Sequence, residues 1–439
     1  MIVINLFNFS FISYKSKFCH YPFVLMRAFI PISIFFVLLG CSDKKAESEY
    51  PIIDVVGSVE KYQRVYCSDY FSSIELIPLE TREDCLLQGG INPNVVLKDS
   101  FIFMRGSDNL YAFSTSGKFL NQIGSKGQGP GEYIYSSRFF LSTDKSVIYV
   151  EDLTKILEYD FNGNHISTIQ RPSSVFSGFH YAGNGVFICS IYNDGKNKYK
   201  YYLLNQNGEF IDSLPNYVFF NREIPIYSTH DTALLPIRVD NKLYLKDFIN
   251  DTLYILEDSK LQPTYIFGLG NYSYPIENLV TTDIMNVMPR NSFFFQSNFA
   301  IVGMPELFFY LIHVPNLFSK PQAKPTHNTF TRELTTNNSN VYGIYNIVEK
   351  TNILLDTDDY GQKGIINDIN GGLPVIPRYY AGDGVVVCAW EADNMKEMLT
   401  DEYFASQNIK DQQAHQKLKE ILKNLKADDN PVVVIAKLK

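Results

Sequence analysis

The sequence predicts an all-β fold, a six-bladed β-propeller with a helical insertion near the C-terminus. Two observations lead to this fold class. Aromatic residues make up 15% of the 439 residues, and nearly all of them are Tyr (30) or Phe (33), a composition that favours strands. In addition, a unit of strand, polar turn and returning strand recurs about every 45 residues, which is the length of one four-stranded propeller blade.

The repeat is clearest in three hairpins whose turns contain Ser-Gly or Asn-Gly, at 110–120, 156–166 and 201–211. A fourth copy, at 253–261, has lost its glycine. These pairs suit hairpins because glycine accepts the positive φ that tight turns require. Each hairpin follows another strand-like run, and these runs lie at 100–104, 146–150, 185–189 and 242–246. Because one four-stranded sheet cannot bury both of its faces, we expect the sheets to pack round an axis.

The last third of the chain is less regular. A fifth hairpin is expected at 341–355, after an irregular stretch at about 307–340. Strands of the sixth blade are expected at 385–390 and 432–438. Between these two strands, apolar residues recur at helical spacing among Lys, Glu and Gln, which predicts a helical insertion at 391–428. The insertion is expected to pack on the rim of the last blade, or else to present a helix to a partner. The whole propeller is expected to span 51–439.

The N-terminal segment has the pattern of a bacterial lipoprotein signal. An apolar run after Met26-Arg27 ends in Leu39-Gly40-Cys41 and is followed at once by polar residues. This pattern predicts a signal peptide at 26–40 and lipid attachment at Cys41. A short linker at 41–50 would follow the lipid anchor.

Residues 1–25 are not needed for this signal, so we expect translation to start at Met26 and 1–25 to be an extension outside the protein. The alternative is a single uncleaved membrane anchor over Phe23–Leu39, which is close to the length that crosses a bilayer. The lipoprotein interpretation places the protein in the cell envelope. It would be lipid-anchored to the outer membrane, on the periplasmic or the surface-exposed face.

Charge and cysteine content narrow the function classes. A formal net charge of −8 gives little of the basic surface that nucleic acids require, so no nucleic-acid partner is expected. The cysteines form no CxxC pair and the seven histidines lack metal-ligand spacing, so no metal or cofactor is predicted. Cys189 and Cys388 lie in strand-like runs and are expected to be small buried apolar side chains. Cys67 and Cys85 could pair in an oxidising compartment.

Three stretches of the chain resemble a bacterial family of six-bladed β-propeller lipoproteins. They are Phe71–Thr81, Gly124–Tyr133 and Asp429–Ile435. The glycine-rich second stretch also resembles a sequence motif of the NHL-repeat propellers. The resemblance covers essentially the whole chain after the signal, and is weakest at about 285–340. It implies a propeller at the cell surface or in the periplasm, and it carries no catalytic residues over to this sequence.

Two further motifs are similar to ligand sites but depart from them. The glycine-rich stretch lacks the Lys and Ser or Thr of a phosphate-binding loop, and Gly131 is followed by Glu132, so a tight turn between blades is expected. Residues 356–361 begin like a calcium loop. However, Tyr360 does not supply the ligand of position 5, and Asn367 replaces the bidentate Glu of position 12, so a solvated acidic turn is expected.

The sequence does not identify a reaction. We expect a non-catalytic binding or interaction protein for a glycan, a peptide or a partner protein, with side chains from several blades meeting at one mouth of the central channel. One alternative is a propeller enzyme, a metal-dependent lactonase or lyase or a glycan-acting hydrolase, that uses residues converging on the same channel. Another is a structural subunit of an outer-membrane assembly. Converging carboxylates or histidines would favour the enzyme, and an apolar or aromatic floor would favour binding.

Overall fold

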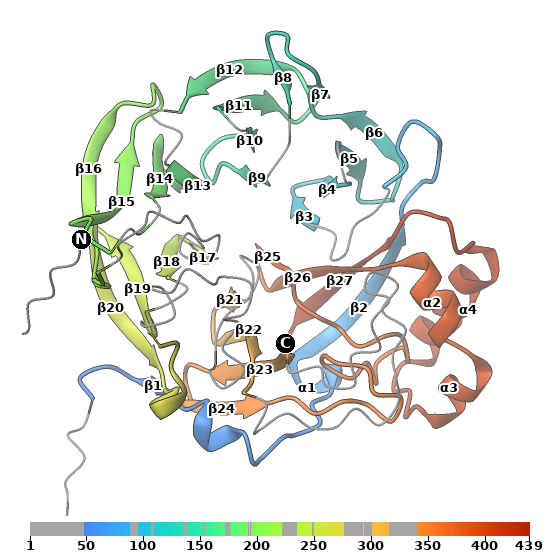
Figure 1. Cartoon of the computed structure of the whole chain (residues 1–439). Coiled ribbons are helices and arrows are strands. Elements are labelled where there is room, and N and C mark those ends of the chain that lie inside the picture. Colours follow the sequence, from blue (N-terminus) through green and yellow to red (C-terminus); the bar gives the residue numbers. More distant parts are fainter. Residues whose placement is uncertain are drawn as a thin grey trace, which may run out of the picture. The chain divides into compact units, whose positions relative to one another are not determined.

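The described part of the computed structural model contains six four-stranded antiparallel sheets, which follow one another round a central axis (Figure 1). The structure describes residues 48–87, 95–106, 109–134, 138–152, 154–171, 176–191, 193, 195–221, 235–247, 250–275, 293, 301–315 and 340–439. These residues belong to one compact unit, Ser48–Lys439. The six-bladed propeller is therefore confirmed. The predicted extension 1–25, the signal peptide 26–40 and Cys41 lie outside the described residues.

The first five sheets are each built from four strands in chain order, and the first strand lies nearest the axis. Blade 1 consists of β3 (Val95–Lys98), β4 (Phe101–Arg105), β5 (Leu110–Ser114) and β6 (Phe119–Gln122). Blade 2 consists of β9 (Arg138–Leu141), β10 (Val147–Glu151), β11 (Lys155–Asp160) and β12 (His165–Gln170). Blade 3 consists of β13 (Phe176–Gly183), β14 (Val186–Ile191), β15 (Tyr199–Leu204) and β16 (Phe210–Pro215).

Blade 4 consists of β17 (Leu235–Val239), β18 (Lys242–Lys246), β19 (Thr252–Glu257) and β20 (Lys260–Phe267). It is extended by β1 (Ile52–Ile53), which pairs in parallel with β20. Blade 5 consists of β21 (Ile301–Met304), β22 (Leu307–His313), β23 (Asn340–Asn346) and β24 (Thr351–Leu354). The expectation of an irregular stretch from residue 307 was wrong for β22, a continuous apolar run that is buried on both faces as the second strand of its blade.

Blade 6 joins the two ends of the unit. Its inner strands are β25 (Tyr379–Gly382), β26 (Val385–Trp390) and β27 (Val432–Leu438), and its outermost strand is β2 (Phe71–Pro78). β2 and β27 are antiparallel, and their register runs from Phe71 opposite Leu438 to Pro78 opposite Val432. Two of the stretches that carry the family resemblance, one near each end of the chain, thus lie side by side in the closure of the ring.

Asn430 holds this closure together at its edge. Its side chain is buried, and its Nδ2 donates to the carbonyl oxygens of Glu80 (2.7 Å) and Cys85 (2.9 Å). Its Oδ1 accepts from the backbone N–H of Leu87 at 2.8 Å. One side chain therefore satisfies three backbone groups of the segment that follows β2, which would otherwise be buried without partners.

The buried apolar side chains of the described residues form six clusters, one between each pair of neighbouring blades. β10 shows how one strand serves two clusters. Ile148 and Val150 pack toward blade 1, whereas Val147 and Tyr149 pack toward blade 3. This alternation is the period of two that a strand imposes on its side chains. Each blade therefore has no core of its own, and its hydrophobic stabilisation comes from its two neighbours.

The glycine of the repeated hairpins has a second role beyond the turn itself. At each of the three glycines φ is positive, and an added Cβ would lie within 3 Å of a carbonyl oxygen at the end of the preceding blade's outer strand. The pairs are Gly117 with Pro78 (2.1 Å), Gly163 with Gln122 (2.3 Å) and Gly208 with Gln170 (2.8 Å). The sequence repeat thus marks contacts between blades as well as turns.

The glycine-rich stretch connects blades 1 and 2, as predicted. It contains a short parallel pair, β7 (Ser125–Lys126) and β8 (Glu132–Tyr133). The Glu132 carboxylate turns back into the loop and accepts a hydrogen bond from the Gly129 N–H at 2.7 Å. The Glu132 carboxylate therefore stabilises the tight turn that joins the two blades.

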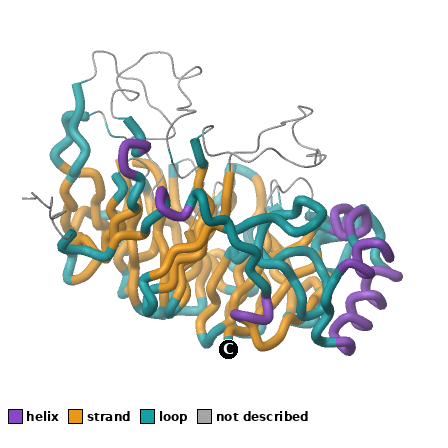
Figure 2. Tube along the Cα trace, turned by 90° about the horizontal axis from the view of Figure 1, so that it is seen from below, coloured by secondary structure: helices purple, strands orange, loops and turns teal. Residues whose placement is uncertain are grey.

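The predicted helical insertion is present between β26 and β27. It forms three helices, α2 (Ala392–Met398), α3 (Asp401–Ser406) and α4 (Gln412–Asn424), and a short α1 (Cys67–Tyr70) precedes β2. Figures 1 and 2 show α2–α4 on the outer side of blade 6, away from the axis. The helices pack against blade 6 through the same cluster that joins blades 5 and 6, which includes Met395, Phe404 and Leu418. No helix in the described part of the chain has the length and hydropathy needed to cross a bilayer.

The four described cysteines are all free and buried, as expected for Cys189 and Cys388. Cys67 and Cys85 do not form a disulfide, because they belong to different clusters on either side of blade 6.

Candidate functional site

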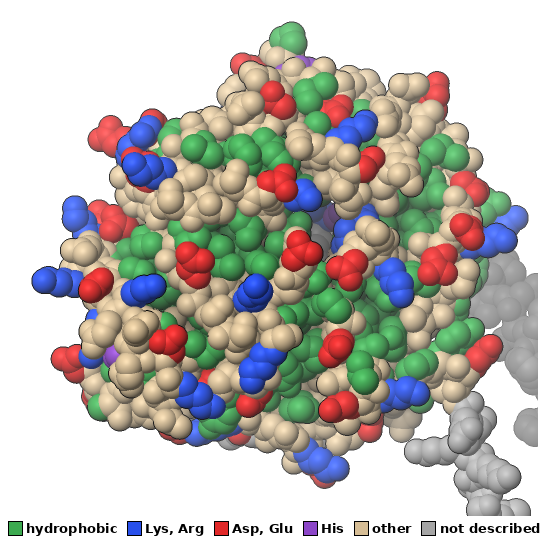
Figure 3. Space-filling view, turned by 180° about the vertical axis from the view of Figure 1, so that it is seen from behind, with side chains coloured by type: hydrophobic (Ala, Val, Ile, Leu, Met, Phe, Trp, Pro, Cys, Tyr) green, Lys and Arg blue, Asp and Glu red, His purple; other side chains and the backbone are tan. Residues whose placement is uncertain are grey.

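A cavity of about 440 Å³ lies on the axis of the ring, and residues from the innermost strand of every blade line it. One lining residue from each blade, in order, is Lys98, Arg138, His180, Arg238, Gly303 and Tyr379. Seen from behind, the middle of the ring is hollowed, and Lys and Arg side chains border the hollow (Figure 3). The predicted concave site at the hub of the propeller is therefore present.

The cavity opens beside the turns that join the first and second strands of the blades. Thr143 of the β9–β10 turn, Asp240 of the β17–β18 turn and Asp383 of the β25–β26 turn line it, and all three are exposed. Since loops at the end of a rigid scaffold tolerate sequence change, this rim is suited to determine what enters.

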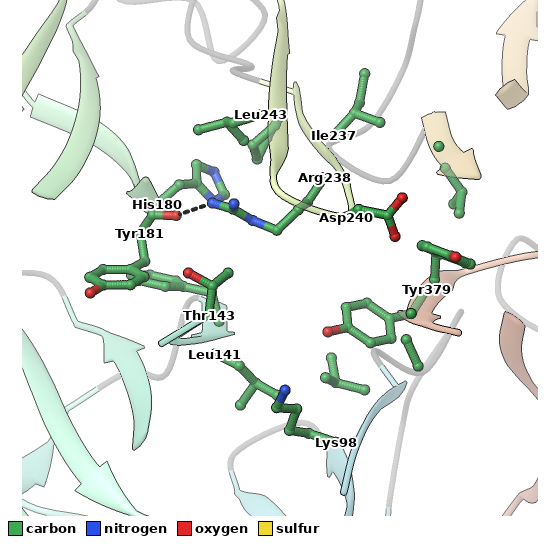
Figure 4. A pocket seen from close by; sticks show the side chains of 18 of the residues that line it. Lys98, Leu141, Thr143, His180, Tyr181, Ile237, Arg238, Asp240, Leu243 and Tyr379 are labelled. Atoms are coloured by element: carbon green, nitrogen blue, oxygen red, sulfur yellow. Dashed lines mark hydrogen bonds between the residues drawn. The ribbon is translucent and has the colours of Figure 1, made fainter. Parts of the chain in front are cut away.

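Arg238 is the most prominent cation of the cavity. Its Nη2 donates to the carbonyl oxygens of Tyr181 (2.8 Å) and Ala182 (3.3 Å), which ties blade 4 to blade 3 (Figure 4). Burial lowers the pKa of its guanidinium, and no carboxylate of the described residues forms an ion pair with it. A positive charge removed from water without an opposite charge is unfavourable, so the site is electrostatically prepared for an anion.

His180 lies next to Arg238 in the cavity wall (Figure 4). Burial, and then the charges of Arg138 and Arg238, lower its pKa well below the usual value, so the imidazole is neutral at pH 7. Its Nε2 is inaccessible to solvent and has no hydrogen-bond partner among the described residues. The other side of the ring packs on Phe140, with the centroids 5.8 Å apart.

Arg138 differs from Arg238 because it has a carboxylate nearby. Its Nε lies 3.8 Å from Oε2 of Glu151, and Nη1 of Arg171 lies 3.9 Å from the other oxygen of the same carboxylate. The Glu151 side chain is buried in blade 2, so this group of charges is largely balanced within its own blade.

Tyr379 and Lys98 extend into the cavity from blades 6 and 1 (Figure 4). Both side chains point into the cavity, whereas the Arg238 guanidinium turns toward Tyr181 in the wall formed by blade 3. Burial raises the pKa of Tyr379, so its hydroxyl remains a hydrogen-bond donor at neutral pH. Among the described residues, neither the Tyr379 hydroxyl nor the Lys98 ammonium has a hydrogen-bond acceptor. Two donors are therefore available to a ligand beside the guanidinium.

Carboxylates are confined to the rim in the described part of the cavity. Asp240 interacts with the Tyr380 hydroxyl, and Asp383 stands at an exposed turn. Nowhere among the described residues do three His, Cys, Asp or Glu side chains come together as metal ligands. At the suggested calcium loop, Oδ1 of Asp358 accepts from the N–H groups of Tyr360 and Gln362, and Asp359 pairs with Arg64 at 2.6 Å. That segment is a hydrogen-bonded turn, although Asp358 is buried rather than solvated.

No single stretch of sequence identified the residues of this cavity. A signal was nevertheless present, because residues 180–189 (HYAGNGVFIC) and 379–388 (YYAGDGVVVC) are copies of one another. In both copies the tyrosine hydroxyl accepts from the N–H of the second glycine, Tyr181 from Gly185 and Tyr380 from Gly384. His180 and Tyr379 are the first residues of the two copies. They occupy equivalent positions in blades 3 and 6, which face each other across the axis.

Fold and site together define a six-bladed β-propeller with a cation-lined axial cavity. The chain belongs to the family described as "Domain of unknown function (DUF4934)", whose model matches residues 50–437. No curated protein matches the chain in sequence.

Among solved structures, the chain is similar to a protein of Bacteroides fragilis described as a candidate exported protein. The identity is 19%, the TM-score is 0.61, and the match covers 88% of this chain and 99% of that one. A member of the duf4221 family from Bacteroides vulgatus matches at 9% identity and a TM-score of 0.46, over 84% and 97% of the two chains. A protein of unknown function from Bacteroides thetaiotaomicron matches at 8% and 0.41, over 83% and 76%. The first of these likenesses shows that the fold is shared.

Proposed function

We propose that this protein is a lipid-anchored, extracytoplasmic β-propeller that binds a small polar ligand, part of a glycan or a peptide, in its axial cavity without transforming it. The lipoprotein signal that ends at Cys41 supports the location. The description of the Bacteroides fragilis neighbour as a candidate exported protein agrees with it.

The observation that carries the binding role is the set of hydrogen-bond donors that face the cavity without a protein acceptor, Lys98 and Tyr379 beside Arg238. Polar groups inside a folded protein normally satisfy one another. Donors kept free in a walled space of about 440 Å³ are suited to a ligand, and the volume lies in the range of small-molecule sites.

Binding is favoured over catalysis by the distribution of acidic groups. In the described part of the cavity the carboxylates lie at the hairpin turns, and burial with the nearby charges of Arg138 and Arg238 keeps His180 neutral. Neither arrangement supplies the pair of closely spaced acid and base groups that hydrolysis of a glycoside requires.

The binding role can be tested by closing the mouth of the cavity. Thr143→Trp places a bulky ring on the exposed β9–β10 turn, and Ser146→Trp adds the same ring to the same turn at a residue that does not line the cavity. Binding to an array of glycans and peptides should be lost in the first variant and retained in the second. Equal binding by both variants would overturn the axial site, and a change in the mass of the bound molecule would overturn the non-catalytic role.

The lipid anchor is tested separately by mass spectrometry of the N-terminus after purification from membranes. A diacylated or triacylated Cys41 is expected. Any other N-terminal residue would contradict the proposal.

A further inference from the structure

Charged side chains of both signs line the axial cavity. Lys98 and Arg238 belong to the inner strands β3 and β17, whereas Asp240 and Asp383 stand at hairpin turns. A ligand that fits both sets has an acidic group and hydrogen-bond donors. A neutral ligand would leave the Arg238 charge uncompensated, and this is costly for a cation withdrawn from water.

The donors without a protein acceptor suit an acceptor with two oxygen atoms. The Lys98 ammonium and the Tyr379 hydroxyl point into the cavity from blades 1 and 6, and the Arg238 guanidinium lies in the wall of the same cavity (Figure 4). Hydrogen bonds from such groups to an ionised acceptor are roughly twice as strong as bonds between neutral groups. On this basis, and resting on the proposed function above, we infer that the ligand is a carboxylate whose acidic group is bound by Lys98 and Tyr379, in a cavity whose wall holds the charge of Arg238, unpaired among the described residues.

A carboxylate fits better than a phosphate for two reasons. The two rim aspartates repel a doubly charged ligand more than a singly charged one. Phosphate sites also commonly use a helix N-terminus, and no helix of the described residues lines the cavity, whose wall consists of strands and hairpin turns. At the turns, Asp240 and Asp383 can accept from hydroxyl groups of an acidic sugar or from the amino group of a peptide.

The test compares each acid with its neutral counterpart by calorimetry, using the full-length protein purified in detergent. The pairs are galacturonate with its methyl ester and triglycine with triglycine amide, and inorganic phosphate is the third arm. We expect at least one free acid to bind about 10-fold or more tightly than its neutral form, the equivalent of one charge-assisted hydrogen bond. The arm that binds distinguishes a sugar acid from a peptide carboxylate.

Two small substitutions and two matched controls locate the site. Lys98→Met and Tyr379→Phe each remove one donor that has no acceptor among the described residues, so folding should not change. Each should weaken binding of the acid by about 10-fold. Lys118→Met on a hairpin turn of blade 1 and Tyr217→Phe on the outside of the ring should leave binding unchanged, since both residues are exposed away from the cavity.

The outcomes separate this inference from the proposed function. If the ester or the amide binds as tightly as the acid, and Thr143→Trp abolishes both, the cavity is a binding site but the carboxylate is wrong. Tighter binding of phosphate than of either acid also overturns the carboxylate. If no arm binds and the protein purified from its native membranes releases no small molecule on denaturation, both the inference and the proposed function fail.

Discussion

The wall of the axial cavity and the junctions between the blades differ in chemistry. At the junctions, apolar and aromatic side chains contact one another, as Tyr149 and Phe187 do edge to face at 4.9 Å between blades 2 and 3. In the cavity, cations and hydroxyls lie among apolar side chains, and Lys98 and Tyr379 have no hydrogen-bond acceptor among the described residues. We therefore expect the contacts at the junctions to account for most of the folding free energy. Side chains such as Lys98 and Tyr379 should contribute little to it.

The largest loss of stability is expected when an aromatic side chain is removed from a junction. Phe308 of β22 is fully buried between blades 4 and 5, with ring centroids 5.3 Å from Tyr265 and 5.7 Å from Tyr244. Phe308→Ala should lower the free energy of unfolding by about 3–5 kcal/mol, measured by urea denaturation. Phe219→Ala, at an exposed position, is the control and should change little. A small loss for Phe308→Ala would mean that the junctions do not hold the ring.

A smaller effect is expected at the closure of the ring. Asn430→Ala leaves the backbone groups of Glu80, Cys85 and Leu87 without their partner, so unfolding should become easier by about 2–4 kcal/mol. Asn424→Ala on the exposed surface of α4 should cost far less, because its side chain bonds only its own helix. Equal losses for the two variants in thermal denaturation would show that the hydrogen bonds of Asn430 at the closure do not contribute more to stability than a surface hydrogen bond.

Glu391, at the start of α2, tests whether a polar group without a hydrogen-bond partner outside the cavity lowers the stability of the fold. Burial, and secondarily the Asp393 carboxylate, raise the pKa of Glu391 to about 7, and its Oε1 has no hydrogen-bond partner among the described residues. Between about pH 4.3, the value of an exposed glutamate, and pH 7, the folded state holds a proton that the unfolded state releases. Stability therefore falls as the pH rises through this range, and does not change further above it.

Glu391→Gln removes that penalty. The variant should come closest to the wild type near pH 4 and be more stable at pH 8 by up to about 3–4 kcal/mol, the full pKa shift converted to free energy. Thermal denaturation at the two pH values measures the difference. An equal difference at both values would show that ionisation of Glu391 does not limit stability.

The smallest change in stability is expected for the cavity side chains. Lys98→Met and Tyr379→Phe should each change the free energy of unfolding by less than about 0.5 kcal/mol, as is usual for substitutions that remove no buried contact. Urea denaturation beside the wild type measures this change. A loss above about 1 kcal/mol would assign these side chains to the scaffold and would weaken the binding role.

Local pattern was sufficient to predict most of the fold. The hairpins with Ser-Gly and Asn-Gly turns could be placed because the turn residues, and the alternation of apolar and polar residues beside them, can be recognised within a few positions. β22 was missed because its run Leu307–His313 is apolar throughout, and such a run shows no alternation when a strand is covered on both faces.

The site could not be predicted in the same way because each blade supplies one side chain. Lys98, His180, Arg238 and Tyr379 are separated in sequence by whole blades, and the ring alone brings them together. The copied stretch at 180–189 and 379–388 was the one local signal that pointed to the axis. It marks a turn that two opposite blades share, and the first residues of the two copies, His180 and Tyr379, both line the cavity.

The pairing of β2 with β27 also determines when the ring can close during synthesis of the chain. Phe71 leaves the ribosome long before its partner Leu438, which lies near the end of the unit Ser48–Lys439. The outer edge of the last sheet therefore stays uncovered until the other blades have been synthesised. Such a distant contact delays the final folding step, and any premature ending of the chain leaves the ring open rather than merely shorter.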